Sequence, residues 1–333
     1  MGEVAQLGRD RVALAQRVVT LRGKAGLLDS TFLLYLLQTD DMQEQLRARA
    51  TGTTVLGIKQ SELRKLVVPL LPIGLQRSAA SVLAAIDERI DLLRETNATL
   101  EAIAQALFKS WFVDFDPVRA KQQGLVPAGM DEATAALFPD SFEESALGLV
   151  PKGWPVKSLQ DLLVLQRGFD LPAQDREPGD FPIIAASGPS GTHVEAMAKG
   201  PGVITGRSGV LGRVFLEFND YWPLNTTLWI KEFRAASPCY AYEVLRLLDF
   251  KAFNVGSAVP TLNRNHIHGL PYVIPSRTCV DAYELLARQM HERARVNEQQ
   301  AQTLVTLRDT LLPRLISGQL RLPEVNLPSE VAG

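Results

Sequence analysis

Two long heptad patterns restrict the fold of this sequence more than any other feature. From about residue 75 to 112, one stripe alternates steps of three and four: Leu83, Ile86, Ile90, Leu93, Asn97, Leu100, Ala104, Leu107 and Trp111. A weaker stripe from about 280 to 316 contains Leu286, Met290, Asn297, Leu304, Leu307 and Leu311, and two of its seam positions are occupied by Arg293 and Gln300. This spacing is typical of a coiled-coil seam. A helix with one apolar seam must bury it, so we expect two helices of roughly 55 Å to pack against each other.

Asn97 and Asn297 are polar members of these two stripes. A buried asparagine needs a hydrogen-bonding partner and can fix the register of a helix pair. The two side chains facing each other would satisfy this need. The alternative is that each asparagine is exposed at a helix bend.

A repeated block precedes each helix. The segment 52–58, followed by Leu63 and Leu66, recurs 204 residues later as 256–262, followed by Ile267 and Leu270. Upstream, 12–21 resembles 222–230 more loosely. Blocks in the same order, each followed by a similar helix, predict a duplication. A chain of 333 residues also exceeds one ordinary core, which favours two domains or two repeated units.

The region between the helices has two parts. Residues 114–150 contain three prolines and an acidic excess, which predict a partly ordered, solvated connector. From Pro151 to Pro275, short β-rich runs at 181–185, 202–205, 214–218 and 227–230 are separated by glycines, and 240–250 has a helical pattern. This part is expected to be a mixed α/β unit.

Composition and motifs exclude several functions. A net charge of −2 excludes a basic field over the whole molecule, so any nucleic-acid binding must use local patches. The two cysteines cannot form a disulfide framework, which favours a cytoplasmic protein, and no apolar run approaches the length of a membrane span. The sequence has no phosphate-binding loop, no dinucleotide-binding glycine motif, no Asn-Pro-Pro-aromatic run and no Glu-x-Lys pair. We therefore expect no catalytic group, metal site or cofactor in this chain.

Five stretches resemble a known family. They are Leu-Phe-Lys-Ser-Trp-Phe-Val-Asp-Phe-Asp-Pro-Val at 107–118, Leu-Leu-Pro-Arg-Leu-Ile-Ser-Gly-Gln-Leu at 311–320, Val-Pro-Lys-Gly-Trp at 150–154, and the runs 202–215 and 221–227. Together they resemble the specificity (S) subunits of Type I restriction–modification systems. The resemblance implies an α+β fold in which two duplicated mixed α/β target-recognition domains are separated by an antiparallel pair of long helices.

The resemblance also implies a function and partners. Such a subunit is not itself an enzyme but binds double-stranded DNA at a bipartite site, whose halves are read by the two domains. Two modification subunits, with S-adenosylmethionine, and restriction subunits, with ATP and Mg²⁺, supply the chemistry. One rival interpretation is a coiled-coil scaffold that binds protein partners, and another is an inactive, truncated specificity subunit.

The resemblance departs from the family pattern at the start, because residues 1–71 match only the last part of the second domain. The expected divisions are the C-terminal part of the first recognition domain (1–72), the central conserved helix (73–115), a linker (116–150), the second recognition domain (151–275), the distal conserved helix (276–318) and a tail (319–333).

Arginine and lysine neutralise phosphates or bind guanine, and asparagine binds adenine. On this basis the candidate DNA-contacting residues are Arg167, Lys199, Arg207, Ser208, Arg213, Asn225, Thr226, Asn263 and Arg264. Remnants of a basic face in the first domain are expected at Arg9, Arg11, Arg17, Lys59 and Arg64. The aromatic residues Phe108, Trp111, Phe112 and Phe115 are expected either to dock the modification subunits or to pack against the recognition domain.

Overall fold

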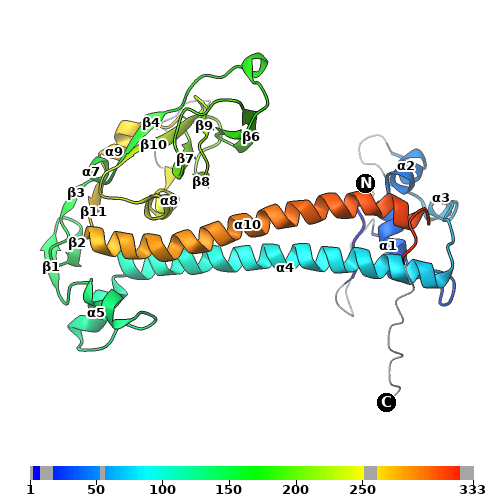
Figure 1. The fold of residues 1–333 in the computed structure, drawn as a ribbon, viewed down its shortest axis with the longest axis horizontal. Coiled ribbons are helices and arrows are strands. Elements are labelled where there is room, and N and C mark those ends of the chain that lie inside the picture. The colour runs from blue at the N-terminus through cyan, green and yellow to red at the C-terminus, as the bar shows by residue number, and fades with distance from the viewer. Residues whose placement is uncertain (1–2, 8–17, 53–56, 251–260, 323–333) are drawn as a thin grey trace. The chain divides into compact units, whose positions relative to one another are not determined.

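The structure is a computed structural model that describes residues 3–7, 18–52, 57–250 and 261–322. The chain divides into two compact units, Met1–Ala98 with Arg295–Gly333 (the first unit) and Thr99–Ala294 (the second unit). Two long helices, α4 (Ile73–Phe112) and α10 (Arg277–Ile316), each contribute one part to each unit. They are the cyan and the orange helix in Figure 1.

Within the first unit, α4 and α10 pack with antiparallel directions (Figure 1). Asp87 of α4 pairs with Arg308, and Asn97, further along α4, pairs with Asn297, which comes earlier in α10. Nδ2 of Asn297 donates to Oδ1 of Asn97 at 2.9 Å, and Asn297 is only 1% exposed. The asparagines therefore face each other, the first of the two alternatives that the sequence left open.

The seam of α10 differs from the predicted one at alternate positions. Leu286 and Leu307 are 38% and 45% exposed, whereas Ala287 and Ala301 are 0% and 1% exposed. The predicted seam positions of Leu286 and Leu307 are therefore wrong. Ala287 and Ala301 are buried instead, each one residue after a predicted position, whereas Asn297 is buried where it was predicted. Burial of alanine lets the helix backbones approach closely, but alanine adds little to an apolar pattern. Met290 and Leu311 are partly buried in the second and first unit respectively.

The seam of α4 has the predicted register. In the first unit Ile90 and Leu93 pack with Ala301, and Ile86 and Leu304 lie at the margin of this cluster. In the second unit Ala104 is fully buried, Leu107 packs against the main core, and Leu100 is partly buried.

The other helices in the described part of the first unit are short. They are α1 (Ser30–Gln38), α2 (Asp40–Ala48) and α3 (Gln60–Leu63). Asp29 caps α1 by accepting from the backbone N–H groups of Thr31 and Phe32, and Thr39 caps α2. The apolar face of α1 is buried together with Leu83 of α4 and Leu315 of α10.

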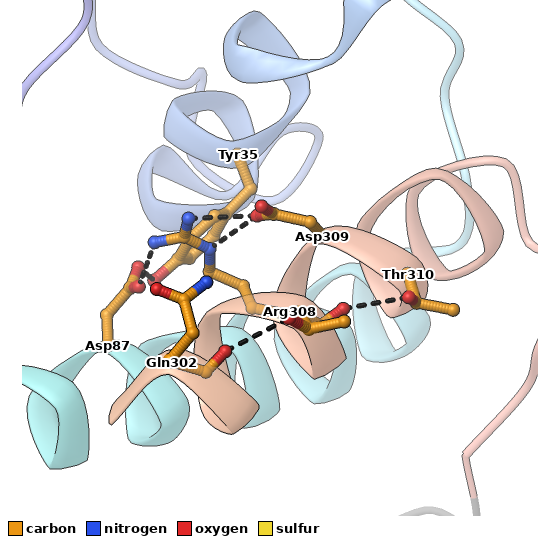
Figure 2. A network of polar contacts seen from close by, with 7 residues as sticks. Tyr35, Asp87, Gln302, Arg308, Asp309 and Thr310 are labelled. Carbon is orange, nitrogen blue, oxygen red and sulfur yellow. Dashed lines mark hydrogen bonds and ion pairs between the residues drawn. The ribbon is translucent and has the colours of Figure 1, made fainter. Parts of the chain in front are cut away.

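A polar network joins α1 to the two long helices in the first unit (Figure 2). The Tyr35 hydroxyl donates to Asp87 Oδ2 at 2.7 Å, and Arg308 Nη1 donates to Asp87 Oδ1 at the same distance. Arg308 also binds Asp309. Burial and the neighbouring Asp87 raise the pKa of Tyr35, which keeps its hydroxyl a donor.

The second unit contains the strands. A four-stranded antiparallel sheet has the order β4 (Leu163–Arg167), β10 (Thr227–Phe233), β7 (Gly202–Gly206) and β8 (Val214–Glu217). A second sheet joins β6 (Gly188–His193), β5 (Phe181–Ala185) and β9 (Trp222–Pro223), with β5 and β9 parallel. Two-stranded pairs are formed by β1 (Phe142–Ser145) with β2 (Gly148–Pro151) and by β3 (Val156–Ser158) with β11 (Pro271–Val273). The mixed α/β class predicted for this unit is confirmed.

Short helices complete the second unit. They are α5 (Asp116–Gln122), α6 (Glu132–Ala136), α7 (Leu159–Leu162), the 3-10 helix at Ala173–Asp175, α8 (Pro238–Leu247) and α9 (Arg264–His268). α8 covers β7 and β8.

The aromatic residues at the end of α4 belong to the core of the second unit. Phe108, Trp111 and Phe112 are 1%, 2% and 6% exposed. The ring of Phe112 meets Tyr240 of α8 edge-on at 4.8 Å, and the Tyr283 hydroxyl donates to the Ala104 carbonyl at 3.1 Å. Of the two alternatives, the structure supports packing, here within the core of the second unit, and these three rings are not exposed for docking.

Residues 114–150 are folded more closely than predicted. Val118 and Phe138 are buried in the same core, and Ala135 is also buried. Lys121 Nζ donates to the backbone carbonyls of Ala135 and Phe138. The expectation of a solvated connector is wrong for these positions, because apolar residues such as Phe138, which contacts Trp111, pack into the core.

A buried charged cluster connects α8 to both long helices within the second unit. Glu243 is 1% exposed and lies 3.4 Å from Arg246 Nη1, which also binds Glu101 of α4 at 2.8 Å. Burial raises the pKa of Glu243 to about 7, although Arg246 opposes the shift. Tyr242 packs edge-on against His291 of α10, and burial lowers the pKa of that histidine.

Equivalent elements of the two halves are separated by a constant interval. Both ends of α10 lie 204 residues after the ends of α4, and α9 begins 204 residues after α3. This is the interval of the sequence repeat, although much of the repeated block (53–56 and 251–260) lies outside the described residues. None of the helices in the described part of the chain is both long and apolar enough to span a membrane.

Candidate nucleic-acid interface

One edge of the four-stranded sheet brings together most of the predicted DNA-contacting residues. Neighbouring strands are antiparallel, so the ends of β4 and β7 meet the beginnings of β10 and β8. The residues at this edge, here called the arginine edge, are Arg167, Arg207, Ser208, Arg213, Asn225 and Thr226.

The backbone of the arginine edge is held by hydrogen bonds between two turns. The backbone N–H groups of Arg207 and Ser208 donate to the Thr226 carbonyl at 2.8 and 3.1 Å. Arg207 Nη1 donates to the Asn225 carbonyl at 2.9 Å. One guanidinium N–H of Arg207 thus positions its neighbour. The other guanidinium hydrogens have no partner within the described part of the chain, so they can donate to a ligand.

The arginine edge is also joined to the second sheet. Thr226 Oγ1 accepts from the Ala186 backbone N–H at 3.3 Å, and Arg213 Nη1 donates to the Ser187 carbonyl at 2.8 Å. Arg213 is exposed, and so is Arg167 at the end of β4. Arginines held on a rigid sheet edge suit the binding of phosphates or guanine, because their geometry is set before a ligand arrives.

One carboxylate, which the sequence analysis missed, lies at the arginine edge. Asp170 Oδ1 accepts a hydrogen bond from Asn225 Nδ2 and lies 3.8 Å from Arg167 Nη2. Its side chain is 71% exposed. Three arginines with one aspartate leave an excess of positive charge, which attracts a polyanion. Asp170 lies in a loop after β4. No local sequence pattern predicts that its partner is Asn225, which is 55 residues away.

Asn263 and Arg264 adjoin the arginine edge through the backbone. The Leu262 N–H donates to the Arg207 carbonyl at 2.8 Å. Asn263 Oδ1 caps α9 by accepting from the Asn265 N–H at 3.0 Å, so this side chain has a structural role. Arg264, in the first turn of α9, is exposed.

Lys199 lies apart from this group. It precedes β7, whereas Arg207 follows β7, so the length of the strand separates them. Its ammonium group forms an ion pair with Asp220 at 2.6 Å and holds the pKa of Asp220 below its ordinary value. The structure therefore does not place Lys199 at the arginine edge.

The candidate residues of the first unit are described only in part. Lys59 and Arg64 flank α3, at its N-cap and C-cap. Arg9, Arg11 and Arg17 lie outside the described residues.

The described residues contain no group of three or more His, Cys, Asp or Glu side chains that could hold a metal ion. Cys239 and Cys279 are both buried, and burial raises the pKa of each thiol. Neither thiol is activated as a nucleophile.

The fold is the one found in S subunits of Type I restriction–modification systems. The crystal structure of such a subunit from M. genitalium aligns with a TM-score of 0.59, at 19% identity, over 86% of this chain and 72% of that one. No family model matches the chain.

Curated relatives agree with this fold. The chain is 25% identical, over 89% of its length and 70% of the relative, to the Type I restriction enzyme MjaIX specificity subunit of Methanocaldococcus jannaschii. It is 24% identical, over 93% of its length and 82% of the relative, to the HindI specificity subunit of Haemophilus influenzae. The resemblance to Type I specificity subunits that the sequence motifs predict is thereby confirmed.

Proposed function

We propose that the chain is the DNA-binding specificity subunit of a Type I restriction–modification complex, and that the arginine edge reads one half of a bipartite site. The observation that carries this proposal is the convergence of Arg167, Arg207 and Arg213 with Asn225 on one rigid sheet edge. Guanidinium groups bind phosphates and guanine, and a side-chain amide binds adenine in the major groove. The relatives named above support the proposal.

In this proposal the chain itself catalyses no reaction. It directs two modification subunits, which use S-adenosylmethionine, and restriction subunits, which use ATP and Mg²⁺, to the DNA that it binds. The chain's own task is to orient cationic and amide side chains toward DNA before contact. The hydrogen bonds from Arg207 to Asn225 and from Arg213 to Ser187 perform that task.

A titration of labelled DNA duplex tests the proposal. The full chain, together with modification subunits from the same source, is measured by fluorescence anisotropy at a series of salt concentrations. We expect affinity to fall steeply as salt rises, because each neutralised phosphate adds about 0.9 to the steepness of log K against log[salt]. Arg207→Ala with Arg213→Ala should flatten this slope.

Arg234→Ala is the matched control. Arg234 follows the other end of β10, and like Arg213 it donates to a backbone carbonyl, that of Gln160. Its replacement removes one positive charge from the opposite edge of the sheet, so it is compared with Arg213→Ala alone. Absence of DNA binding at low salt by the complete complex would overturn the proposal. So would equal binding by Arg213→Ala and the Arg234→Ala control, which is the result expected of a protein-binding scaffold.

A further inference from the structure

Asn225 lies in a turn whose backbone is held in place by several hydrogen bonds. Its carbonyl accepts from Arg207 Nη1 at 2.9 Å, and the next carbonyl, of Thr226, accepts from two backbone N–H groups. The Thr227 N–H and hydroxyl both donate to the Leu224 carbonyl. The backbone on both sides of the Asn225 side chain is therefore fixed.

Asp170 fixes the side chain as well. An ionised carboxylate only accepts hydrogen bonds, so the Asn225 group facing Asp170 must be the NH₂ and not the carbonyl oxygen. Without such a partner, an exposed asparagine amide can rotate and exchange the two ends. Asp170 is itself restrained by Arg167, whose Nη2 lies 3.8 Å from the same oxygen.

The bond to Asp170 uses one amide hydrogen of Asn225. Among the described residues the other hydrogen and Oδ1 have no partner, and they form a donor–acceptor pair. This pair matches the N7 acceptor and N6 donor of adenine in the major groove. A cytosine or thymine edge offers only one of the two groups, and guanine offers two acceptors.

We infer that Asp170 is a positioning residue that holds the Asn225 amide in the orientation that reads an adenine of the target site. The inference rests on the proposed function and deepens it, because it assigns the base class to one side chain. Asp170 carries negative charge at a surface proposed to bind phosphates, so it should oppose non-specific DNA binding. Asp170 should therefore lower the affinity for non-specific DNA and raise the affinity for the target site. A purely structural residue would not change these two affinities in opposite directions.

The test first selects the target from a randomised duplex pool. The wild-type full chain with its modification subunits should enrich a bipartite sequence containing an adenine whose replacement weakens binding. Asn225→Ala should remove the preference at that position alone. Asp170→Ala should lower the ratio of specific to non-specific affinity about 5- to 150-fold, the range of one bidentate base contact. Non-specific affinity should stay equal or rise.

Three further variants separate positioning by Asp170 from a general effect of its charge. Asp170→Ala combined with Asn225→Ala should show the same base preference as Asn225→Ala alone, because Asp170 acts on that preference through Asn225. Asp170→Asn should lose preference at the same base, because an amide can pair with either end of Asn225. The control Asp175→Asn changes the same charge at an exposed position of the same unit and should leave the ratio unchanged.

The outcomes are distinguishable. A wild-type complex that enriches no sequence overturns the proposed function. A wild-type complex that enriches a sequence, with Asp170→Ala equally selective, overturns only the role of Asp170. Enrichment of guanine, cytosine or thymine at the position that Asn225→Ala affects overturns the adenine assignment. Equal melting temperatures for wild type and Asp170→Ala are expected, because the Asp170 side chain is 71% exposed.

Discussion

Replacing both asparagines of the helix seam by leucine should stabilise the first unit, whereas replacing one should destabilise it. Asn297 is 1% exposed, and its Oδ1 is buried with no hydrogen-bond partner among the described residues. The hydrogen bond between the two side chains runs from Asn297 Nδ2 to Asn97 Oδ1. Seam asparagines thus lower stability in exchange for a defined register.

The magnitudes follow from the atoms concerned. Asn97→Leu removes a hydrogen bond of about 1 kcal/mol and leaves a buried amide without its acceptor, at about 1–3 kcal/mol. Burial of part of the leucine returns about 1–2 kcal/mol, so a net loss of about 1–2 kcal/mol is expected. The double variant has no stranded amide and buries two leucines, so we expect a gain of about 1–3 kcal/mol.

Native-state hydrogen exchange of the full chain measures the effect locally, in peptides from 86–98 and 295–305. Gln300→Leu is the control, because Gln300 is exposed on the same helix, and its effect should stay within about 0.5 kcal/mol. A double variant that is no better protected than the single variants would refute the reasoning, since the stranded amide would then carry no cost.

Three further predictions concern other parts of the chain. Burial raises the pKa of Glu243 from 4.5 to about 7. Between these two pH values the folded protein keeps a proton on Glu243 that the unfolded chain has lost. The free energy of unfolding should therefore fall by about 3 kcal/mol as pH rises from 4.5 through 7. In thermal melts from pH 4.5 to 8, the melting temperature of Glu243→Gln should fall less with pH than that of the wild type. Identical pH profiles for the two proteins would contradict the prediction. Tyr35→Phe should cost about 1 kcal/mol and Asp87→Ala about twice that, because Asp87 accepts from two side chains, and exchange of α1 peptides measures both. Equal losses would argue against a shared network. Gly206→Ala should weaken DNA binding. The Cβ of the new alanine would lie 1.8 Å from the Val210 carbonyl oxygen, so the turn that follows β7 would have to move. Unchanged affinity for DNA would show that this turn is not part of the interface.

The sequence predicted the helices well because their signal repeats many times. Each long helix offers about ten turns of periodicity, so single substitutions do not hide it. The alternate seam positions of α10 were missed because Ala287 and Ala301 contribute close approach and little hydrophobicity. Burial of the 114–150 segment was missed because its contacts, such as Phe138 with Trp111, depend on residues distant in sequence.

The arginine edge was predictable only as a set of residue types. Arg207 and Asn225 are suitable ligands for DNA, but their mutual bond depends on the strand order, which no local pattern gives. Lys199 had the same chemical suitability as Arg213, yet it lies at the other end of β7. Asp170 is an ordinary loop carboxylate in the sequence and acquires its role only from the neighbours that the fold supplies.

The 204-residue interval between the long helices has a consequence for how chains associate. By this interval Asn97 of α4 corresponds to Ala301 of α10, and Asn297 corresponds to Leu93. In the folded chain the two polar residues pair with each other, because Asn297 donates a hydrogen bond to Asn97. The two apolar residues, Leu93 and Ala301, lie in one hydrophobic cluster. Two copies of α4 packed in the same way would set Asn97 against Leu93, and two copies of α10 would set Asn297 against Ala301. Each of these pairs of identical helices would leave two asparagine amides without a hydrogen-bond partner. The asparagines therefore favour the pairing of α4 with α10 over the pairing of two identical helices.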